Sequence, residues 1–338
     1  MAVAPPPMVV LPAPAGINHG AGLVALGEER LLACWYSGRS EGGRDAVILC
    51  SRSRDGGGAW SSPSTVSRPG ERAAGALRAA KSVGNVALAR DGRGRVIMVS
   101  GEIQGRRILG VETCRNWRCG RIDFRISTDE GARWSPPTRL DDRPGALSRA
   151  KPVRFEGDDM VPVYQEAGRA SVLRLDLSRL ETGRVPDLAV QPIPAHGPLI
   201  QPALAEAGGR LVALLRDPRR RFVNSSRFQH GAWTPAVATD LENPGSAVEA
   251  FTDARGRLVA VYNPGRKDRR TLRLAASTDG VHFSSGCDVV PKGSAGDAAY
   301  PSVARTGPRT WGLVFSIQGK RQIVFMRWDQ AFLDGCLP

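Results

Sequence analysis

The stretch Gly208-Gly209-Arg210-Leu211-Val212-Ala213-Leu214-Leu215 is one of six copies of a single pattern, and this repetition sets the architecture of the chain. Each copy places a Gly-rich or charged turn before a short apolar run. The apolar runs begin at Leu31, Val96, Met160, Leu211, Leu258 and Trp311, at intervals of roughly 45–65 residues. Strand-like units that recur in this way are typical of a β-propeller, because each unit buries its apolar faces only by stacking around an axis.

The segments on either side of each copy complete a four-stranded unit. A short apolar segment precedes the turn, so that segment, turn and run predict a β-hairpin. A third segment shows two-residue alternation, as in Ile122, Phe124 and Ile126. The sequence therefore predicts an all-β fold, a single six-bladed β-propeller of four-stranded antiparallel blades over residues 1–338. The expected blades are roughly 17–70, 80–140, 148–190, 198–240, 246–290 and 298–330.

The composition is that of a basic globular protein. The 338 residues carry a net charge of +14, which attracts nucleic acid, anionic lipid or an acidic substrate. The arginines are spread through predicted turns apart from residues 219–221 and 266–270, so no nucleic-acid partner is expected. No stretch of about 18 apolar residues predicts a membrane span. Residues 1–8 lack the features of a signal peptide, which slightly favours the cytoplasm over a periplasmic or secreted location, and a monomer is expected.

The chain contains six cysteines, Cys34, Cys50, Cys114, Cys119, Cys287 and Cys336. A chain of this length does not need disulfides to fold. Only Cys114 and Cys119 are close in sequence, and they would bridge a hairpin loop in an oxidising compartment. No second cysteine pair or histidine cluster accompanies them, so neither a metal site nor a cofactor is expected.

The turn after the third strand carries the most specific local motif. Residues 53–60 and 127–134 both have the pattern Ser-x-Asp-x-Gly-x-x-Trp, and residues 277–283 are a shortened version that ends in Phe. In residues 226–233, Phe228 stands in the place of the Asp, and the third and sixth repeats lack the motif. The Asp accepts backbone N–H bonds across the turn and the aromatic ring packs between strands, so the motif is expected to be structural.

This motif resembles the Asp-box of sialidases and related BNR-repeat propellers. Further stretches are similar to the sialidase-like BNR proteins of bacteria and plants. They are Asn18-His19-Gly20, residues 35–42 with Asp45, Lys151-Pro152, Ile200-Gln201-Pro202, Leu215-Arg216, Asn243-Pro244-Gly245-Ser246, Val261-Tyr262-Asn263 and Ala299-Tyr300-Pro301. The resemblance runs from about residue 17 to 328 and implies a six-bladed sialidase-type propeller.

Two rings of polar residues mark a candidate pocket. The first strand of each blade lies innermost in a propeller, so its entrance opens on the central mouth. Polar residues stand at all six entrances, namely His19, Asn85, Lys151, Gln201, Glu249 and Tyr300. A second polar set follows the second strands and includes Arg39, Glu41, Glu102, Gln104, Glu166, Arg216, Asn263 and Gln318. Any one of these residues would also serve to cap a strand, but two rings at equivalent positions indicate a binding site.

The sialidase resemblance implies a role for each residue type. A carboxylate nucleophile would be repelled by the carboxylate of a 2-keto sugar acid, so a neutral Tyr attacks, assisted by a nearby Glu. Tyr300 and Glu249 would form this pair, with Asp45 or Glu41 as the acid/base and Glu166 as an alternative acid. The substrate carboxylate would be held by Arg39 and Arg216, with Lys151 adding positive charge. The sugar hydroxyls would bond Gln201, Asn263, Asn85 and His19.

The predicted function is a sialidase-like glycoside hydrolase that releases a terminal acidic sugar from a glycan or glycoconjugate. The sequence has no Phe/Tyr-Arg-Ile-Pro segment near its start and no evident triad of arginines, so another uronic or keto-sugar acid would suit the site equally well. The alternatives are a non-catalytic carbohydrate-binding propeller and a polysaccharide lyase or hydrolase acting on another acidic glycan. A scaffold whose cationic rim binds acidic partners is a further alternative.

Overall fold

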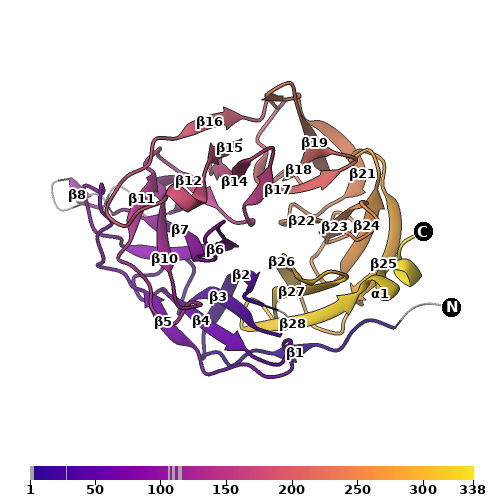
Figure 1. Cartoon of the computed structure of the whole chain (residues 1–338), viewed down its shortest axis with the longest axis horizontal. Helices are drawn as coiled ribbons and strands as arrows, with labels where there is room; N and C mark the ends of the chain where they lie inside the picture. The colour runs from indigo at the N-terminus through magenta and orange to yellow at the C-terminus, as the bar shows by residue number, and fades with distance from the viewer. Residues whose placement is uncertain (1–3, 28, 106, 109–110, 113–115) are drawn as a thin grey trace.

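The computed structural model describes residues 4–27, 29–105, 107–108, 111–112 and 116–338. Six antiparallel sheets are arranged as blades around a central axis (Figure 1). The six-bladed, all-β propeller predicted from the repeats is thereby confirmed. Within the described residues, no helix has the length and hydropathy of a segment that crosses a membrane.

The blades follow one another in chain order. The first blade contains β2 (Ile17–Ala25), β3 (Leu31–Gly38), β4 (Val47–Ser53) and β5 (Ser64–Ser67). The second contains β6 (Ser82–Arg90), β7 (Val96–Ile103), β10 (Gly120–Ser127) and β11 (Thr138–Asp141), with the small pair β8 (Arg107–Ile108) and β9 (Val111–Glu112) beside it. The third contains β12 (Ala146–Ser148), β13 (Val153–Phe155), β14 (Asp158–Gln165), β15 (Arg169–Leu175) and β16 (Ala189–Pro192).

The second half of the ring repeats this order. The fourth blade contains β17 (Ile200–Ala207), β18 (Arg210–Arg216), β19 (Phe222–Gln229), β20 (Ala232–Trp233) and β21 (Val237–Glu242). The fifth contains β22 (Glu249–Thr252), β23 (Leu258–Tyr262), β24 (Leu272–Ser277) and β25 (Ser284–Val290). The sixth contains β26 (Ala298–Gly307), β27 (Thr310–Ile317) and β28 (Gln322–Asp329), followed by helix α1 (Gln330–Cys336).

The two ends of the chain close the ring together. Strand β1 (Val9–Val10) pairs with β28, with Val9 opposite Phe325 and Val10 opposite Val324. Figure 1 shows β1 lying along the outer side of the last sheet. The fourth strand of the sixth blade therefore comes from the N-terminal segment, which the sequence analysis assigned to no blade.

A β-bulge near the mouth interrupts the inner strand of four blades. Register shifts occur in β2, β6, β17 and β26, and each contains one residue with positive φ, namely Gly20 (+63°), Asn85 (+39°), Gln201 (+51°) and Tyr300 (+59°). A bulge turns a side chain away from the regular alternation of the strand. Because left-handed backbone is strained for residues other than Gly, its recurrence at three polar positions marks the mouth as a specialised region.

The third blade differs from its predicted form. The short segment before its turn, residues 152–155, contributes only β13, and the mouth end of the inner strand is β12. Both strands pair with β14, and residues 149–152 connect them. Lys151 therefore lies in the connection between the two strands and not at the entrance of the mouth.

The Asp-box turns are held by their own side chains. In the first blade, Asp55 Oδ1 accepts the Ala59 backbone N–H at 3.0 Å, and Ser53 Oγ accepts that of Gly57 at 2.8 Å. The second turn repeats both bonds, with Asp129 Oδ1 accepting from Arg133 at 2.8 Å. In the fifth blade Asp279 Oδ1 accepts from Val281 at 2.8 Å. These carboxylates are engaged in the local structure that the sequence analysis expected.

Two disulfides join neighbouring elements of the first blade and of the last two blades. Cys34 on β3 is the direct cross-strand partner of Cys50 on β4, and Cys287 on β25 is bonded to Cys336 of α1. The sequence analysis expected no need for such bonds and considered only Cys114 with Cys119. Closeness in sequence does not reveal these two bonds, because sheet pairing and the return of α1 bring their thiols together. Cys119 is itself disulfide-bonded. Cys114 lies outside the described residues.

Candidate functional site at the mouth of the ring

Tyr300 lies at the centre of a hydrogen-bonded group formed by two non-adjacent blades. Its Oη accepts hydrogen bonds from Arg216 Nη1 and from Gln201 Nε2, both at 3.2 Å. Arg216 Nη1 also donates to Gln201 Oε1 at 3.0 Å. Gln201 comes from the bulge of β17 and Arg216 from the end of β18. The structure thus brings together three residues that the sequence analysis placed at the mouth.

Tyr164 extends this group to two further blades. Its Oη accepts from Gln201 Nε2 at 3.3 Å and from Asn85 Nδ2 at 3.4 Å. Burial, with the nearby negative groups of Tyr300 and Glu166, raises the pKa of Tyr164 above its ordinary value. Tyr164 therefore remains a neutral phenol that fixes Gln201 and Asn85. The sequence analysis did not select it, because it lies inside the apolar run of β14.

The environment of Tyr300 lowers the pKa of its hydroxyl. Burial alone would raise the pKa of Tyr300. The positive charge of Arg216, the bond donated by Gln201 and the charge of Arg269 outweigh this effect, so the pKa is held below its ordinary value. The hydroxyl is therefore a better nucleophile than a free tyrosine.

His19 presents a neutral imidazole to the mouth. Its ring lies 4.1 Å from that of Tyr300, and its Nδ1 is 2.6 Å from Ser316 Oγ. Ser316 Oγ donates to the Ala299 carbonyl at 3.1 Å, so it must accept from Nδ1–H. Nε2 is then an unprotonated acceptor, and it is buried with no hydrogen-bond partner among the described residues. Burial and the positive charges of Lys320 and Arg269 lower the pKa of His19, which keeps the ring neutral.

Cationic side chains surround this group on several sides. Arg269 is half-buried, and its pKa is lowered by burial and by the like charge of Arg216. Lys320 lies at the rim and pairs with Glu41 at 2.6 Å. Arg269 belongs to the basic segment 266–270, which the sequence analysis noted only as a charge run. A carboxylate or another anion is the ligand that such a lining attracts.

Two carboxyl groups flank the mouth. Glu41 contacts Lys320 and acts electrostatically on Tyr36 and Tyr300. Glu166 follows β14 at the surface of the mouth, and partial loss of its hydration, with repulsion from Glu41, raises its pKa. A carboxyl group with a raised pKa stays protonated to a higher pH, as a general acid requires.

Glu249 reaches Tyr300 only through Arg149. Its Oε1 accepts from Lys151 Nζ at 3.1 Å and from the Ala250 N–H at 2.9 Å, and its Oε2 lies 3.8 Å from Arg149 Nη2. The guanidinium carbon of Arg149 is 5.9 Å from the Tyr300 ring centre. No contact among the described residues joins Glu249 to the Tyr300 hydroxyl. Gln201 therefore occupies the position beside the phenol that the resemblance gave to a Glu.

Arg149 was missed by the sequence analysis although it is central to the site. It is 2% exposed and donates to the carbonyls of Val248 and Pro301, both at 2.7 Å. It thus ties the inner strands of the fifth and sixth blades beneath Tyr300. Lys151 lines a cavity of about 220 Å³ at the other end of the channel, away from the Tyr300 hydroxyl.

The remaining candidates are engaged in contacts with residues other than Tyr300. Arg39 is 89% exposed at the side chain, and Asp45 accepts from its backbone N–H at 2.8 Å and its Nε at 3.0 Å. These bonds lower the pKa of Asp45. Asn263 is fully buried and donates to the carbonyls of Thr271 and Ala298. Within the described contacts, none of these three residues meets Tyr300.

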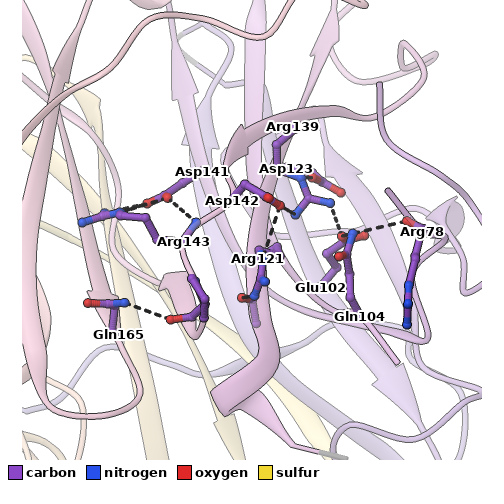
Figure 2. Close-up of polar contacts among 12 residues, drawn as sticks. Arg78, Glu102, Gln104, Arg121, Asp123, Arg139, Asp141, Asp142, Arg143 and Gln165 are labelled. Atoms are coloured by element: carbon purple, nitrogen blue, oxygen red, sulfur yellow. Dashed lines mark hydrogen bonds and ion pairs between the residues drawn. The ribbon is translucent and has the colours of Figure 1, made fainter. Parts of the chain in front are cut away.

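Two members of the second polar ring are engaged in a separate network on the second blade (Figure 2). Glu102 Oε1 accepts from Arg139 Nη2 at 2.5 Å and from Gln104 at 3.0 Å, and Arg139 Nε lies 3.2 Å from Asp123. Burial and the neighbouring Glu102 raise the pKa of Asp123. Because these buried charges form ion pairs with one another between β7, β10 and β11, we interpret the network as structural.

Comparison with known proteins agrees with this architecture. A family model described as a BNR repeat-like domain matches residues 29–312. No curated protein sequence matches the chain. A protein of unknown function from Dyadobacter fermentans is similar in structure, with 13% sequence identity and a TM-score of 0.72, over 95% of this chain and 96% of that one.

Two sialidase structures are similar to the same extent. The NanB sialidase of Streptococcus pneumoniae is 11% identical with a TM-score of 0.73, over 97% of this chain and 71% of that one. The intramolecular trans-sialidase of Ruminococcus gnavus is 11% identical with a TM-score of 0.71, over 94% and 96% of the two chains. At these identities the similarity shows a sialidase-like propeller fold.

Proposed function

The chain belongs to the family of BNR repeat-like domains, and from this membership we propose that it is a glycoside hydrolase that releases a terminal acidic sugar from a glycan. One observation carries the proposal. The hydroxyl of Tyr300 is held by Arg216 and Gln201 inside a mouth lined by cations, and its pKa is lowered there. A packed core has no need of a buried phenol activated in this way.

The buried polar atoms of the mouth that lack a hydrogen-bond partner among the described residues indicate which groups a ligand should carry. Arg216 Nη1 is occupied by Tyr300 and Gln201, but its buried Nε has no hydrogen-bond partner in the part of the chain that the structure describes. This donor requires an acceptor such as a carboxylate oxygen, and the charge of Arg269 would add to the attraction. His19 Nε2 requires a donor, which a sugar hydroxyl supplies. A sugar that carries both a carboxylate and a free hydroxyl meets these requirements.

The proposed reaction uses Tyr300 and Glu166. The Tyr300 phenolate, stabilised by positive charge and not by a neighbouring carboxylate, attacks the anomeric carbon. Glu166 gives its proton to the departing glycosidic oxygen, so a tyrosyl–sugar intermediate and a free alcohol form. Water then attacks the anomeric carbon, the Glu166 carboxylate takes the water proton, and the phenolate leaves.

A second function is favoured by one specific observation. The residue bonded to the Tyr300 hydroxyl is Gln201, whose amide takes up no proton. A site with this arrangement would also suit a propeller that binds an acidic sugar without cleaving it. The two functions share the ligand and differ only in turnover.

Turnover of a panel of fluorogenic glycosides tests the proposal. The panel contains sialosides, other 2-keto sugar acids and uronides, with the matching neutral glycosides as controls. We expect release of the fluorophore from at least one acidic glycoside and from no neutral one. Calorimetric binding of the free acidic sugars without turnover would establish the binding propeller, and absence of both would refute an acidic-sugar site.

Replacing Glu166 by Gln is expected to affect substrates according to their leaving group. A natural glycan, whose leaving alcohol needs a proton, should be cleaved about 10²–10⁴-fold more slowly, whereas a nitrophenyl glycoside should lose far less. The pH dependence of kcat/KM for the nitrophenyl glycoside should lose its fall at high pH. That fall reports deprotonation of Glu166, whose pKa is raised. Equal losses on both substrates would exclude Glu166 as the acid.

A further inference from the structure

On the face opposite the mouth, the Asp-box loops of the first, second and fifth blades each pack against the preceding blade. A methyl group on Gly57 of the first blade would lie 2.0 Å from the Phe325 ring of the sixth. A methyl group on Gly131 of the second blade would lie 2.7 Å from Leu32 of the first. Gly280 of the fifth blade approaches Val212 of the fourth in the same way, at 3.0 Å. Three of the six seams between blades are sealed by these loops.

Two further seams are sealed by other elements. The 3₁₀ turn Leu177–Arg179 of the third blade buries Leu177 among residues of the second, and the Leu177 and Ser178 carbonyls accept from Arg95. Helix α1 of the sixth blade covers the fifth, to which the Cys287–Cys336 bond fastens it. The seam between the third and fourth blades is the one that these loops, the 3₁₀ turn and α1 do not cover.

The fourth blade lacks the loop that would cover this seam. The Thr234 N–H bonds to the Arg227 carbonyl, as Ser135 bonds to Ile126 and Ser61 to Arg52 in the intact Asp-boxes. Phe228 therefore takes the register of the motif's Ser and not of its Asp, and the loop is two residues shorter. This corrects the alignment made from the sequence. His230 and Gly231, with φ of +51° and +78°, form a tight turn between β19 and β20 instead.

Two observations show that the short turn leaves its surroundings unfilled. A methyl group added to Gly209 or Gly231 would meet nothing within 4 Å, in contrast to the glycines of the Asp-boxes. Trp60 and Trp134 each donate their Nε1–H to a glycine carbonyl of the loop, at 3.1 Å. The corresponding Nε1 of Trp233 is buried, and no described residue accepts a hydrogen bond from it.

The uncovered seam forms a cleft of about 600 Å³. Its lining includes Phe155, Glu156, Arg210, Phe228, Gln229 and His230. The rings of Phe155 and Phe228 meet edge to face, with centres 6.2 Å apart, and Phe155 is only half-buried. Among the described contacts, the side chains of Glu156, Arg210 and His230 have no polar partner. The cleft thus combines one aromatic surface with an unused anion, cation and imidazole.

We propose that this cleft is a second carbohydrate-binding site, which takes a neutral mono- or disaccharide unit. Its volume lies within the range of small-molecule sites. A sugar ring has an apolar C–H face for Phe155 and hydroxyls that donate to Glu156 and accept from Arg210 at the same time. Adjacent opposite charges do not favour an anionic ligand such as a nucleic acid, and one half-buried ring offers little to a lipid. The site lies at the opposite end of the strands from Tyr300 and is independent of turnover there.

Ligand-observed saturation-transfer NMR on the full chain tests the proposal, with lactose, maltose, cellobiose and xylobiose as probes. We expect transfer to at least one disaccharide, reduced at least about fivefold by Phe155→Ala and by Arg210→Ala. Arg309→Ala is the matched control, because Arg309 is an exposed arginine at the equivalent turn of the sixth blade. It should leave the signal unchanged, as should Tyr300→Phe.

Grafting an Asp-box into the fourth blade provides a second, independent test of the proposed site. Residues 228–232 are replaced by Ser-Thr-Asp-Glu-Gly-Ala-Arg, the sequence of residues 127–133. The longer loop should cover the seam and abolish saturation transfer while binding at the mouth persists. Absence of transfer to all four disaccharides, or transfer that survives both Phe155→Ala and Arg210→Ala, would overturn the proposal. Because loss of hydrolysis leaves this readout intact, the two proposals fail separately.

Discussion

Replacement of Tyr300 by Phe is expected to lower kcat/KM by about 10³-fold or more while the protein stays folded. The change removes the one atom that attacks the anomeric carbon in the proposed reaction. The ring that packs against His19 and Arg149 is kept. Arg216 and Gln201 still bond each other, so the free energy of unfolding should change by no more than about 1 kcal/mol. Steady-state kinetics and urea denaturation measure the two quantities.

A second buried tyrosine provides the control for this experiment. Tyr262 on β23 is 4% exposed and lies in the core between the fourth and fifth blades, away from the mouth. Tyr262→Phe should leave kcat/KM within about twofold of the wild-type value. Binding of the free acidic sugar should survive Tyr300→Phe within a few fold, since the cations remain. A Tyr300→Phe enzyme that keeps a tenth of its activity would exclude Tyr300 as the nucleophile.

The repeats made the central part of the mouth predictable. Equivalent positions of a repeat occupy equivalent places around the axis, so Tyr300, Gln201 and Asn85 could be assigned to one ring before any coordinates were known. Arg216 followed from the same logic, applied to the ends of the second strands. Local pattern was sufficient there because each residue stands at the boundary between a turn and an apolar strand.

Other parts of the site depend on contacts that no local pattern records. Arg149 bonds Val248 and Pro301, about 100 and 150 residues further along the chain. Arg269 reaches the mouth from a loop whose sequence indicates only a charge run. Tyr164 is hidden among apolar neighbours on β14. In each case the tertiary arrangement, and not the spacing in sequence, assigns the side chain to the site.

The fold shows the same division between local and distant information. The hydrogen bonds of the Asp-boxes lie within one turn, and the sequence motif indicated them correctly. Closure of the ring by β1 and the Cys287–Cys336 bond join segments far apart in the chain. The fourth blade shows that even a local motif is misaligned when the loop is shortened, since only the sheet register identified the position of Phe228.

Replacement of Glu249 by Gln is expected to lower the free energy of unfolding by about 3–5 kcal/mol. Glu249 is fully buried between Arg149 and Lys151, and the amide would leave both cations without an anionic partner. Urea denaturation at neutral pH measures this loss. At low temperature, where the variant is folded, kcat should fall by less than about tenfold, because the carboxylate touches the cations and not the Tyr300 hydroxyl.

A double variant separates the electrostatic explanation from simple loss of packing. Lys151→Met in the Glu249→Gln background removes one of the two cations that have lost their anionic partner. The free energy of unfolding of the double variant should therefore be higher than the sum of the two single effects predicts. Glu41→Gln is the exposed counterpart, since Glu41 also pairs with a lysine, and it should cost less than about 1 kcal/mol. If Glu249→Gln instead lowered kcat by about 10³-fold without changing the stability, Glu249 would have a role in catalysis. Its charge would then act on Tyr300 through Arg149.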